Sequence, residues 1–437
     1  MVARSGMFLD RGRKGRGMIR LFALLIVICG WYLTPVGEAE PHFPEEIRIG
    51  LGVNQKTIEL VLPEAGEIIS DQGKHLVLEA GCHRLRWESG GIYLGKLRLA
   101  ANRLHVLSRN AGSFLGYRNR LYRGSFQVLR TKAGLTLVNL LGLEEYLLGV
   151  VPWEMPAGWA PEALKTQAVA ARTYTIGRMG VHSAEGFDLC AGTHCQVYGG
   201  ASAEHETTNR AVAETRGEVM LFDNKPITAV YHSASGGYTE DSANVWGWIS
   251  PYLQGVPDQD RSPYVSWEKE ISWSEFIGKI LRKYPELKYV RAVEPTAYGV
   301  SGRISRLRLD GGAVTLEITG EQFRHLFGLR STLFALIFEG EAGRLLYRPG
   351  ETLPRFLPWQ EEEPAFGVDP AFPEEGLFRL KPENFRVERV RIVGSGWGHG
   401  VGLSQWGSKA QAEEGKTYRD ILGYYYKEIR IQSMYVL

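Results

Sequence analysis

The chain has 437 residues, a formal net charge of +2, 44% apolar residues and 23% charged residues. These values are ordinary for globular proteins, and the length leaves room for two or three domains. The balanced charge, without a stripe of lysine and arginine, argues against nucleic acid as a partner. The 52 glycines and 11% aromatic residues indicate many turns and favour stacking on ring-shaped ligands, although turns and core packing explain them equally well.

Residues 1–39 have the composition of an export signal, in which basic residues precede the apolar run Leu21–Leu33. This run is about a dozen residues long, whereas a membrane-spanning helix needs roughly 20. We therefore predict a signal peptide that is removed near Ala39, and the alternative is an uncleaved N-terminal membrane anchor. Met18 is an alternative start that would leave a short basic leader. In each case we expect the remainder of the protein to lie outside the cytoplasmic membrane.

A linker rich in proline and glutamate (residues 40–46) precedes residues 47–116, which are predicted to form a β-rich accessory region. Short apolar or alternating segments such as Thr57–Leu62 are separated by breaks that contain glycine or asparagine. We predict an α+β protein, in which this β-rich module is followed by a mixed α+β domain over residues 117–437 with an active-site cleft. Residues 340–386, studded with proline and glutamate, are predicted to be a surface insertion in that domain.

One acidic residue, Glu154, stands between Trp153 and Met155, with a proline two residues away on either side. Burial among such apolar side chains raises the pKa of a carboxyl group, which suits a general acid at neutral pH. The alternative is an ordinary charge at the tip of a loop. A helix is predicted to follow, because Pro161 favours a first helical turn and small apolar residues recur after it at helical spacing.

The residues His182, Cys190, His194 and Cys195 lie within a stretch of fourteen residues. Two histidines and two cysteines can hold a structural zinc ion in tetrahedral geometry, although the spacing is not that of a standard zinc finger. Two alternatives stay open: a disulfide between Cys190 and Cys195, which an exported protein allows, and plain buried thiols beside structural histidines. Removal of the leader leaves an odd number of cysteines, so they cannot all pair within the chain. No organic cofactor is predicted.

A predicted strand, Pro226–Tyr231, leads into the segment His232-Ser233-Ala234-Ser235-Gly236-Gly237. Small hydroxyl side chains and glycine N–H groups at the end of a strand are typical of ligand sites. A serine nucleophile is disfavoured, because no G-x-S-x-G elbow is present and neighbouring residues of a strand face opposite sides. Trp246 and Trp248 follow, and they suit either stacking on sugar rings or plain packing.

Glycine occupies every second position from Gly394 to Gly402, a pattern that permits close backbone approach to a ligand or to another segment. The segment is not a phosphate-binding loop, because the Gly-Lys-Ser/Thr ending is missing. His399 within it has either an active-site role or a structural one. Two helices are predicted to follow, over residues 409–414 and, behind a capping box, over Tyr418–Tyr426.

Four blocks, in this order, resemble the signature of the stage II sporulation protein D (SpoIID)/LytB family. They are Leu143–Tyr174 with its Glu-Met-Pro and Gln-Ala-Val-Ala-Ala-Arg-Thr-Tyr motifs, His194–Tyr198, His232–Gly237 and Gly396–Gln405. The resemblance runs from about Tyr122 to the C-terminus, apart from the insertion, and does not cover residues 47–116. Four ordered motifs make the resemblance specific.

The resemblance implies an exported protein that remodels peptidoglycan, secreted or anchored to the cell membrane and facing the cell wall. Such proteins are first known from engulfment during endospore formation. The sporulation branch is a lytic transglycosylase acting on peptide-free glycan strands, and its catalytic glutamate corresponds to Glu154. The LytB branch enhances an N-acetylmuramoyl-L-alanine amidase. The alternative is therefore a non-catalytic wall-binding protein whose partner is a cell-wall amidase such as stage II sporulation protein P. Some members carry zinc on a similar His/Cys cluster.

A single acid is enough for transglycosylase chemistry, whereas ordinary glycoside hydrolysis needs two carboxylates. Glu154 is expected to protonate the glycosidic oxygen and then to deprotonate the muramic acid 6-hydroxyl, whose internal attack gives a 1,6-anhydro end. Arg172, in the predicted helix, is expected to bind a lactyl carboxylate or to orient the acid. The remaining predicted substrate contacts are His232, Ser233, Ser235, Gly236, Gly237, Trp397, His399 and Gln405.

Overall fold

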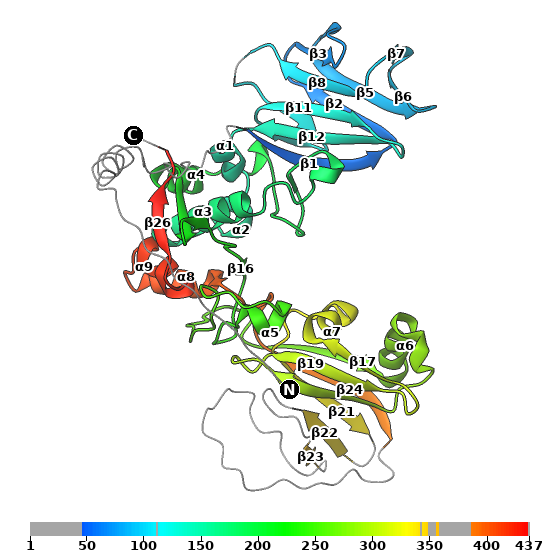
Figure 1. Cartoon of the computed structure of the whole chain (residues 1–437), viewed down its shortest axis with the longest axis vertical. Coiled ribbons are helices and arrows are strands. Elements are labelled where there is room, and N and C mark those ends of the chain that lie inside the picture. The colour runs from blue at the N-terminus through cyan, green and yellow to red at the C-terminus, as the bar shows by residue number, and fades with distance from the viewer. Residues whose placement is uncertain (1–45, 111, 341–342, 348–354, 358–385, 436–437) are drawn as a thin grey trace, which may run out of the picture. The chain divides into compact units, whose positions relative to one another are not determined.

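The computed structural model describes residues 46–110, 112–340, 343–347, 355–357 and 386–435. The described residues all belong to one compact unit. Figure 1 labels its helices and strands. The predicted leader (residues 1–39), all of the 40–46 linker except residue 46 and most of the 340–386 insertion lie outside the described residues.

Two β-sheets form the N-terminal part of the structure. The first contains, in spatial order, β13 (Leu189–Cys190), β1 (Ile47–Gln55), β12 (Leu135–Leu141), β11 (Ser125–Arg130), β8 (Arg103–Ser108), β3 (Gly66–Ser70) and β4 (His75–Leu78). The second contains β10 (Arg120–Tyr122), β9 (Leu115–Tyr117), β2 (Thr57–Leu62), β5 (Gly81–Glu88), β6 (Gly91–Leu94) and β7 (Leu97–Leu99). Buried and exposed residues alternate along β2, as expected for a strand with one face on the core.

The β-rich region continues past the boundary predicted at residue 117. β9 pairs with β10 across that position, and β11 pairs with β8 on one side and with β12 on the other. β12 in turn pairs with β1, so the first strand of the region depends on a strand that ends at Leu141. The two sheets therefore extend to Leu141, and the chain enters the helical part directly after it.

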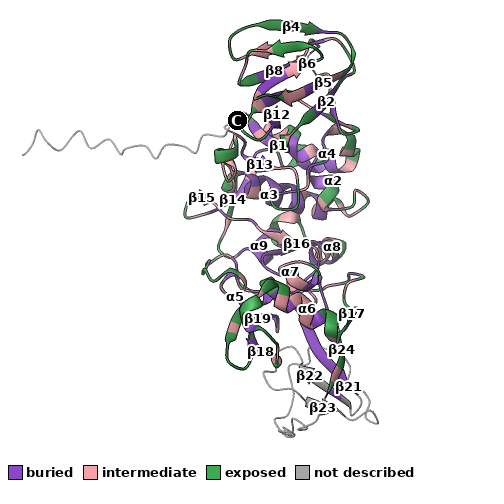
Figure 2. Cartoon of the chain, turned by 90° about the vertical axis from the view of Figure 1, so that its right-hand side faces the viewer, coloured by how far each residue is buried: buried purple, intermediate pink, exposed green. Residues whose placement is uncertain are grey.

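The helical part is built around α3 (Pro161–Gly177), most of whose residues are buried (Figure 2). Its many alanines allow close packing against α1 (Leu143–Leu148), α4 (Glu206–Glu214), α8 (Gln405–Glu413) and α9 (Tyr418–Tyr425). A small sheet, β15 (Lys225–Pro226), β14 (Glu218–Phe222) and β26 (Arg430–Ser433), completes this layer. Val169 and Ala170 of α3 share one core with Val401 and Leu403, so the helix supports the glycine-rich segment directly.

The remaining elements form a second α+β assembly with its own core. One sheet has the order β17 (Trp267–Ser272), β24 (Val387–Gly394), β21 (Phe334–Gly340), β22 (Gly343–Tyr347) and β23 (Arg355–Leu357). Another joins β18 (Ala292–Tyr298), β19 (Ile304–Asp310) and β20 (Thr315–Thr319). The helices α6 (Trp273–Lys283) and α7 (Gly320–Phe327) contribute apolar side chains to the same core. Gly340 pairs with Val387, so the two ends of the predicted insertion are neighbours in one sheet.

The structure confirms the predicted α+β class. It also confirms the helix that begins at Pro161 and the capping box of Thr417 and Asp420 in front of α9. The helix predicted over residues 409–414 begins four residues earlier, at Gln405, because Ser404 caps it by accepting the Gly407 N–H. The predicted continuous strand Pro226–Tyr231 is wrong, because only its ends lie in β15 and β16 (Tyr231–His232). A tight turn closed by the Val230 N–H and the Thr228 carbonyl (2.9 Å) interrupts it.

Candidate functional site

Two sequence-distant motifs meet through a short parallel pair of strands. β16 (Tyr231–His232) pairs with β25 (Leu403–Ser404), and Ala234 forms a further bridge with Trp397. The His232–Gly237 segment therefore runs beside the glycine-rich segment, as the resemblance to one family implies for motifs of a single site.

The alternating glycines are explained by this contact. Gly396, Gly398, Gly400 and Gly402 all have positive φ, which residues with a side chain rarely adopt. A Cβ atom at Gly398 would lie 2.6 Å from the Cβ of His232. The glycines thus let one backbone approach another segment of the protein, which is one of the two alternatives that the sequence predicted.

A cavity of about 590 Å³ opens where these segments meet α2 (Val151–Glu154) and the loop after β13. Its lining combines an acid, imidazoles, hydroxyls, amides, indole rings and two guanidinium groups, a mixture suited to a polar ligand with ring faces. The lining residues include Glu154, Tyr174, Arg178, His194, Gln196, Tyr231, His232, Ser233, Trp246, Trp248, Arg324, Trp397, His399 and Gln405.

Glu154 is the last residue of α2, and its place follows from the sequence. Met155 precedes Pro156, which favours extended backbone, so the helix ends and the Met155 side chain enters the core. The Gln405 amide donates a hydrogen bond to Glu154 Oε2 over 3.2 Å. Burial raises the pKa of the Glu154 carboxyl above its ordinary value of 4.5, and hydrogen bonding to Gln405, Tyr231 and the Val197 backbone partly opposes this shift.

Two histidines in the cavity are held neutral. Burial, together with nearby positive charge, lowers the pKa of His232 far below its usual value and that of His399 to about 3. His232 Nδ1 donates to the Val401 carbonyl over 3.1 Å, which leaves its buried Nε2 as an acceptor without a partner in the described residues. His399 Nδ1 accepts the Val401 N–H over 3.1 Å. The unpartnered Nε2 of a neutral His232 is suited to accepting a hydrogen bond from a hydroxyl group.

Aromatic rings border the cavity on two sides. Trp246 and Trp248 stack with their centroids 5.6 Å apart and their planes at 9°, and each is more than a third exposed. Trp397, which is 41% exposed, packs against Tyr264, and the Arg330 guanidinium lies over its ring. Large indole side chains that are partly open to solvent are suited to stacking on flat or ring-shaped ligands.

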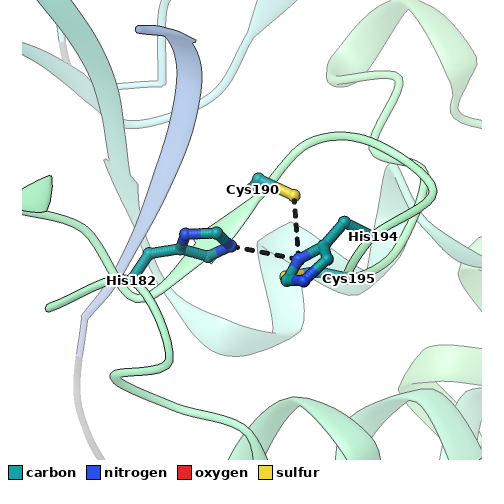
Figure 3. Close-up of side chains that lie close together, drawn as sticks. All are labelled: His182, Cys190, His194 and Cys195. Atoms are coloured by element: carbon teal, nitrogen blue, oxygen red, sulfur yellow. Dashed lines mark hydrogen bonds between the residues drawn. The ribbon is translucent and has the colours of Figure 1, made fainter. Parts of the chain in front are cut away.

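Figure 3 shows the four predicted metal ligands converging, and all four ligand atoms lie within 4.8 Å of one another. Two of them, His194 and Cys195, also line the cavity. His194 Nδ1 is 3.2 Å from His182 Nε2, 3.9 Å from Cys190 Sγ and 3.5 Å from Cys195 Sγ. Tetrahedral zinc with its usual bond lengths would place such ligands about 3.3–3.8 Å apart. Cys190 and Cys195 are free thiols, so the described residues contain no disulfide between them.

Glu185 adds a feature typical of metal sites to this cluster. Its carboxylate lies 2.6 Å from Nδ1 of His182, the ring nitrogen opposite the one that faces the cluster. A carboxylate in this position fixes the tautomer of a metal-binding histidine and increases its basicity. The residues present therefore fit a zinc ion well.

The structure places the other predicted residues in two groups. His232, Ser233, Trp397, His399 and Gln405 line the cavity with Glu154. Arg172 does not line it: it is fully buried, and its guanidinium binds both oxygens of Glu144 at 2.8 Å. Ser235, Gly236 and Gly237 also lie outside the lining, where they shape the loop; the Gly237 N–H donates to Ser235 and the Gly236 N–H to Asp260.

Several cavity residues have no place in the sequence prediction. Gln196 falls inside a recognised motif and Tyr231 directly precedes one, but neither carries a signal of its own, because their roles depend on contacts between segments. Arg178 and Arg324 come from α3's end and from α7, and only the fold brings them to one cavity. The closely spaced Trp246 and Trp248 were noted in the sequence as suited to stacking on sugar rings, and both line the cavity.

Among the described residues, no helix combines the length and apolar character needed to cross a lipid bilayer.

Comparisons with known proteins agree with the motif pattern. The family model described as stage II sporulation protein (SpoIID) matches residues 131–222. The amidase enhancer of Bacillus subtilis is 30% identical over 372 residues, 81% of this chain, and the chain spans only half the length of that protein. Stage II sporulation protein D of Bacillus subtilis is 30% identical over 313 residues, 68% of this chain and 76% of that protein.

An uncharacterised protein of Brachyspira hyodysenteriae is likewise 30% identical, over 71% of this chain and 72% of its own length. The ordered motifs, their meeting at one cavity and these similarities lead to one assignment. The chain belongs to the SpoIID/LytB family.

Proposed function

We propose that this protein is exported, acts on peptidoglycan outside the cytoplasmic membrane and cleaves peptide-free glycan strands as a lytic transglycosylase. The observation that carries this proposal is the single acid in the cavity. Among the described residues that line it, Glu154 is the only carboxylate, and burial raises its pKa. Hydrolysis with two carboxylates does not suit such a cavity, whereas internal attack by a substrate hydroxyl requires one acid that becomes a base.

In the proposed reaction, protonated Glu154 gives its proton to the glycosidic oxygen, and the bond between that oxygen and the anomeric carbon breaks. The leaving strand departs with a new hydroxyl group. The Glu154 carboxylate then accepts the proton of the muramic acid 6-hydroxyl while this oxygen bonds to the anomeric carbon. The product is a 1,6-anhydro end, no water is consumed, and Glu154 regains its proton. Because the nucleophile belongs to the substrate, proximity makes its attack favourable.

The surroundings of Glu154 suit both halves of this cycle. Burial favours the neutral acid before the first proton transfer, and the Gln405 amide stabilises the carboxylate that forms afterwards. His232, Ser233 and His399 are proposed to hydrogen-bond sugar hydroxyls. Trp246, Trp248 and Trp397 are proposed to stack on sugar rings.

We further propose that His182, Cys190, His194 and Cys195 hold a structural zinc ion. Zinc with four protein ligands has no open position, so it would supply a fixed link between loops rather than chemistry. Thr193 to Val197 line the cavity, so the cluster holds part of its wall in place. Elemental analysis of the exported protein is expected to find one zinc ion per chain, and a disulfide between Cys190 and Cys195 would contradict the proposal.

The alternative function is enhancement of a cell-wall amidase without catalysis. It is favoured by the similarity to the amidase enhancer of Bacillus subtilis, which extends over 81% of this chain. In that case the same cavity would bind a glycan strand, and a cell-wall amidase such as stage II sporulation protein P would be the partner.

Incubation of the purified protein, without an amidase, with peptide-free glycan strands separates the two functions. The transglycosylase proposal predicts shortened strands with anhydro-muramyl ends. Binding of the strands without new ends, combined with faster amide cleavage when an amidase is added, would support the enhancer instead. Residues 1–39 fused to a reporter enzyme that is active only after export would test the proposed location.

A further inference from the structure

Gln196 is a buried residue that links the cluster of His182, Cys190, His194 and Cys195 to the surroundings of Glu154. It follows Cys195 directly, is 2% exposed and lines the cavity. Its neighbour Val197 contributes a backbone hydrogen bond to Glu154. The loop that carries both is closed by the Tyr198 N–H, which donates to the Ala191 carbonyl over 3.2 Å.

The hydrogen bonds of Gln196 fix the orientation of its side-chain amide. Its Nε2 lies 3.3 Å from the carbonyl oxygen of Ala171, which can only accept. With the nitrogen facing Ala171, Oε1 accepts from the Tyr146 hydroxyl at 3.3 Å and lies 2.8 Å from the Thr175 hydroxyl, whose single hydrogen is shared with the Ala171 carbonyl at 2.8 Å. The second hydrogen of Nε2 points at the Tyr231 hydroxyl oxygen, 2.9 Å away.

This arrangement decides where the hydrogen of Tyr231 points. A tyrosine hydroxyl has one hydrogen, and the Gln196 N–H already occupies a lone pair of its oxygen. The hydrogen is thus free for another acceptor, and the Glu154 carboxyl interacts with this same hydroxyl. Burial keeps the pKa of Tyr231 well above its usual value, so the hydroxyl retains its hydrogen at all relevant pH values.

We propose that Gln196 is a positioning residue, which holds the Tyr231 hydroxyl so that its hydrogen is directed at the carboxylate of Glu154. This inference rests on the proposed acid role of Glu154. In the reaction, the held hydroxyl stabilises the carboxylate left after the first proton transfer. A hydrogen bond from a preorganised donor costs no reorientation at that moment, unlike one from a freely rotating hydroxyl.

Other ionisable groups near Glu154 remain in place when Gln196 is changed. Tyr146 is electrostatically coupled to the carboxyl group, and the same cavity is lined by Tyr174, Arg178, His194, Cys195, His232, Arg324 and His399. The experiment therefore has to show that a changed pKa of Glu154 after substitution of Gln196 acts through Tyr231 and not through one of these groups. Comparison of the two single variants, at Gln196 and at Tyr231, with the double variant shows this.

The test is direct titration of the Glu154 carboxyl in the full chain by carbon NMR with labelled glutamate, assigned with Glu154→Gln. Gln196→Met removes both amide donors at similar side-chain length. It is expected to raise the pKa of Glu154, Tyr231→Phe is expected to raise it similarly, and the double variant is expected to add nothing to Tyr231→Phe. Thr166→Val, which removes a buried hydroxyl of the same helix that bonds the Glu162 carbonyl, is the matched control and is expected to leave the titration unchanged.

If Gln196→Met lowers stability but leaves the pKa of Glu154 unchanged, Gln196 has only a structural role and the proposal fails. The proposal also fails if Gln196→Met shifts the pKa of Glu154 further in the Tyr231→Phe protein. Should Gln196→Met not fold, the Gln196 amide protons report on the same contact. One of them is expected to lose protection from exchange in Tyr231→Phe, and an unchanged pair would overturn the proposal. These readouts need no substrate, so absence of catalysis would refute the proposed function without deciding this inference.

Discussion

The carboxyl group of Glu154 interacts with the Gln405 amide, the Tyr231 hydroxyl and the Val197 backbone. Among the described residues that line the cavity, no other carries a carboxylate. The sequence indicated this residue through its apolar neighbours and flanking prolines. It could not indicate the partners, because Gln405, Tyr231 and Val197 come from three distant segments. At the scale of single residues, a flanking pattern predicts an unusual acid, and only the fold reveals what tunes it.

The raised pKa of Glu154 has a consequence for stability. Below the ordinary pKa of 4.5 the carboxyl is neutral in both the folded and the unfolded chain, whereas above it the unfolded carboxyl ionises freely and the folded one resists. Stability is therefore lost as pH rises through the folded pKa. Glu154→Gln is expected to melt at a higher temperature than the wild type at pH 7, with the difference vanishing below about pH 4. Calorimetry at both pH values checks this, and equal melting at pH 7 would contradict the raised pKa.

For Arg172, the sequence predicted a substrate contact, whereas the structure shows a structural ion pair. Its side chain is fully buried and bound to both oxygens of Glu144. Arg172→Ala leaves that carboxylate without its partner, so a loss of about 3–5 kcal/mol in the free energy of unfolding is expected. Arg291→Ala breaks an exposed pair with Asp310 and should cost at most about 1 kcal/mol. Denaturant unfolding measures both, and a stable Arg172→Ala with weakened glycan binding would instead favour the predicted lactyl contact.

Among the elements, the glycine-rich segment gives the sharpest relation between sequence and packing. Its alternation predicted a close approach, and β25 indeed runs beside β16. The sequence could not name the neighbour. The neighbour of Gly400 is the buried Arg303, whose guanidinium donates to the Tyr238 carbonyl. Arg303 belongs to none of the recognised motifs. Likewise the continuous strand predicted over Pro226–Tyr231 fails, because a local turn overrides its apolar pattern.

Two glycines with nearly equal φ angles allow the cost of a left-handed φ to be separated from the cost of overpacking. Gly400 and Gly415 have φ of 84° and 85°, but a Cβ at Gly400 would lie 2.4 Å from Arg303, whereas one at Gly415 meets nothing. Gly415→Ala is expected to cost about 1–2 kcal/mol for the left-handed backbone. Gly400→Ala should cost on the order of 1–3 kcal/mol more, because the side chain overpacks the site. Equal losses in denaturant unfolding would show that Arg303 gives way.

The loop held by His182, Cys190, His194 and Cys195 is the second element whose role can be tested. If zinc links its ends, Cys190→Ser combined with Cys195→Ser should abolish zinc content and lower the melting temperature by several degrees. Cys82→Ser is the matched control, because that thiol is exposed and distant in sequence, and it should change neither quantity. Normal melting of the double variant would indicate that the cluster needs no metal.

On the scale of the whole molecule, composition and motif order predicted the α+β class and the family, whereas the extent of the β-rich region required the structure. Strand pairing between β1 and β12 joins residues that no local pattern connects. The cavity itself is also a property of the assembled chain, since its lining comes from α2, α3, α5 (Ser242–Trp246), α7 and the segments around β16 and β25.

A cavity that holds a glycan strand should depend on the aromatic faces at its border. Trp248→Ala removes one half of the stacked pair and is expected to weaken binding of peptide-free strands about fivefold to tenfold, equal to roughly 1.0–1.4 kcal/mol. Tyr289→Ala removes a comparably exposed aromatic side chain outside the cavity and serves as the control. Binding is measured by calorimetry with the Glu154→Gln protein, so that no strand is cleaved. Equal affinities would place the strand away from the tryptophans.

The central claim is that Glu154 cleaves glycan strands by internal attack without water. Product masses from peptide-free strands, digested in water labelled with the heavy oxygen isotope, test it most directly. The account predicts new muramyl ends that lack the mass of one water, contain no heavy oxygen, and form about 10²–10⁴-fold more slowly with Glu154→Gln. Ends that carry the heavy isotope, or cleavage that Glu154→Gln leaves intact, would contradict it.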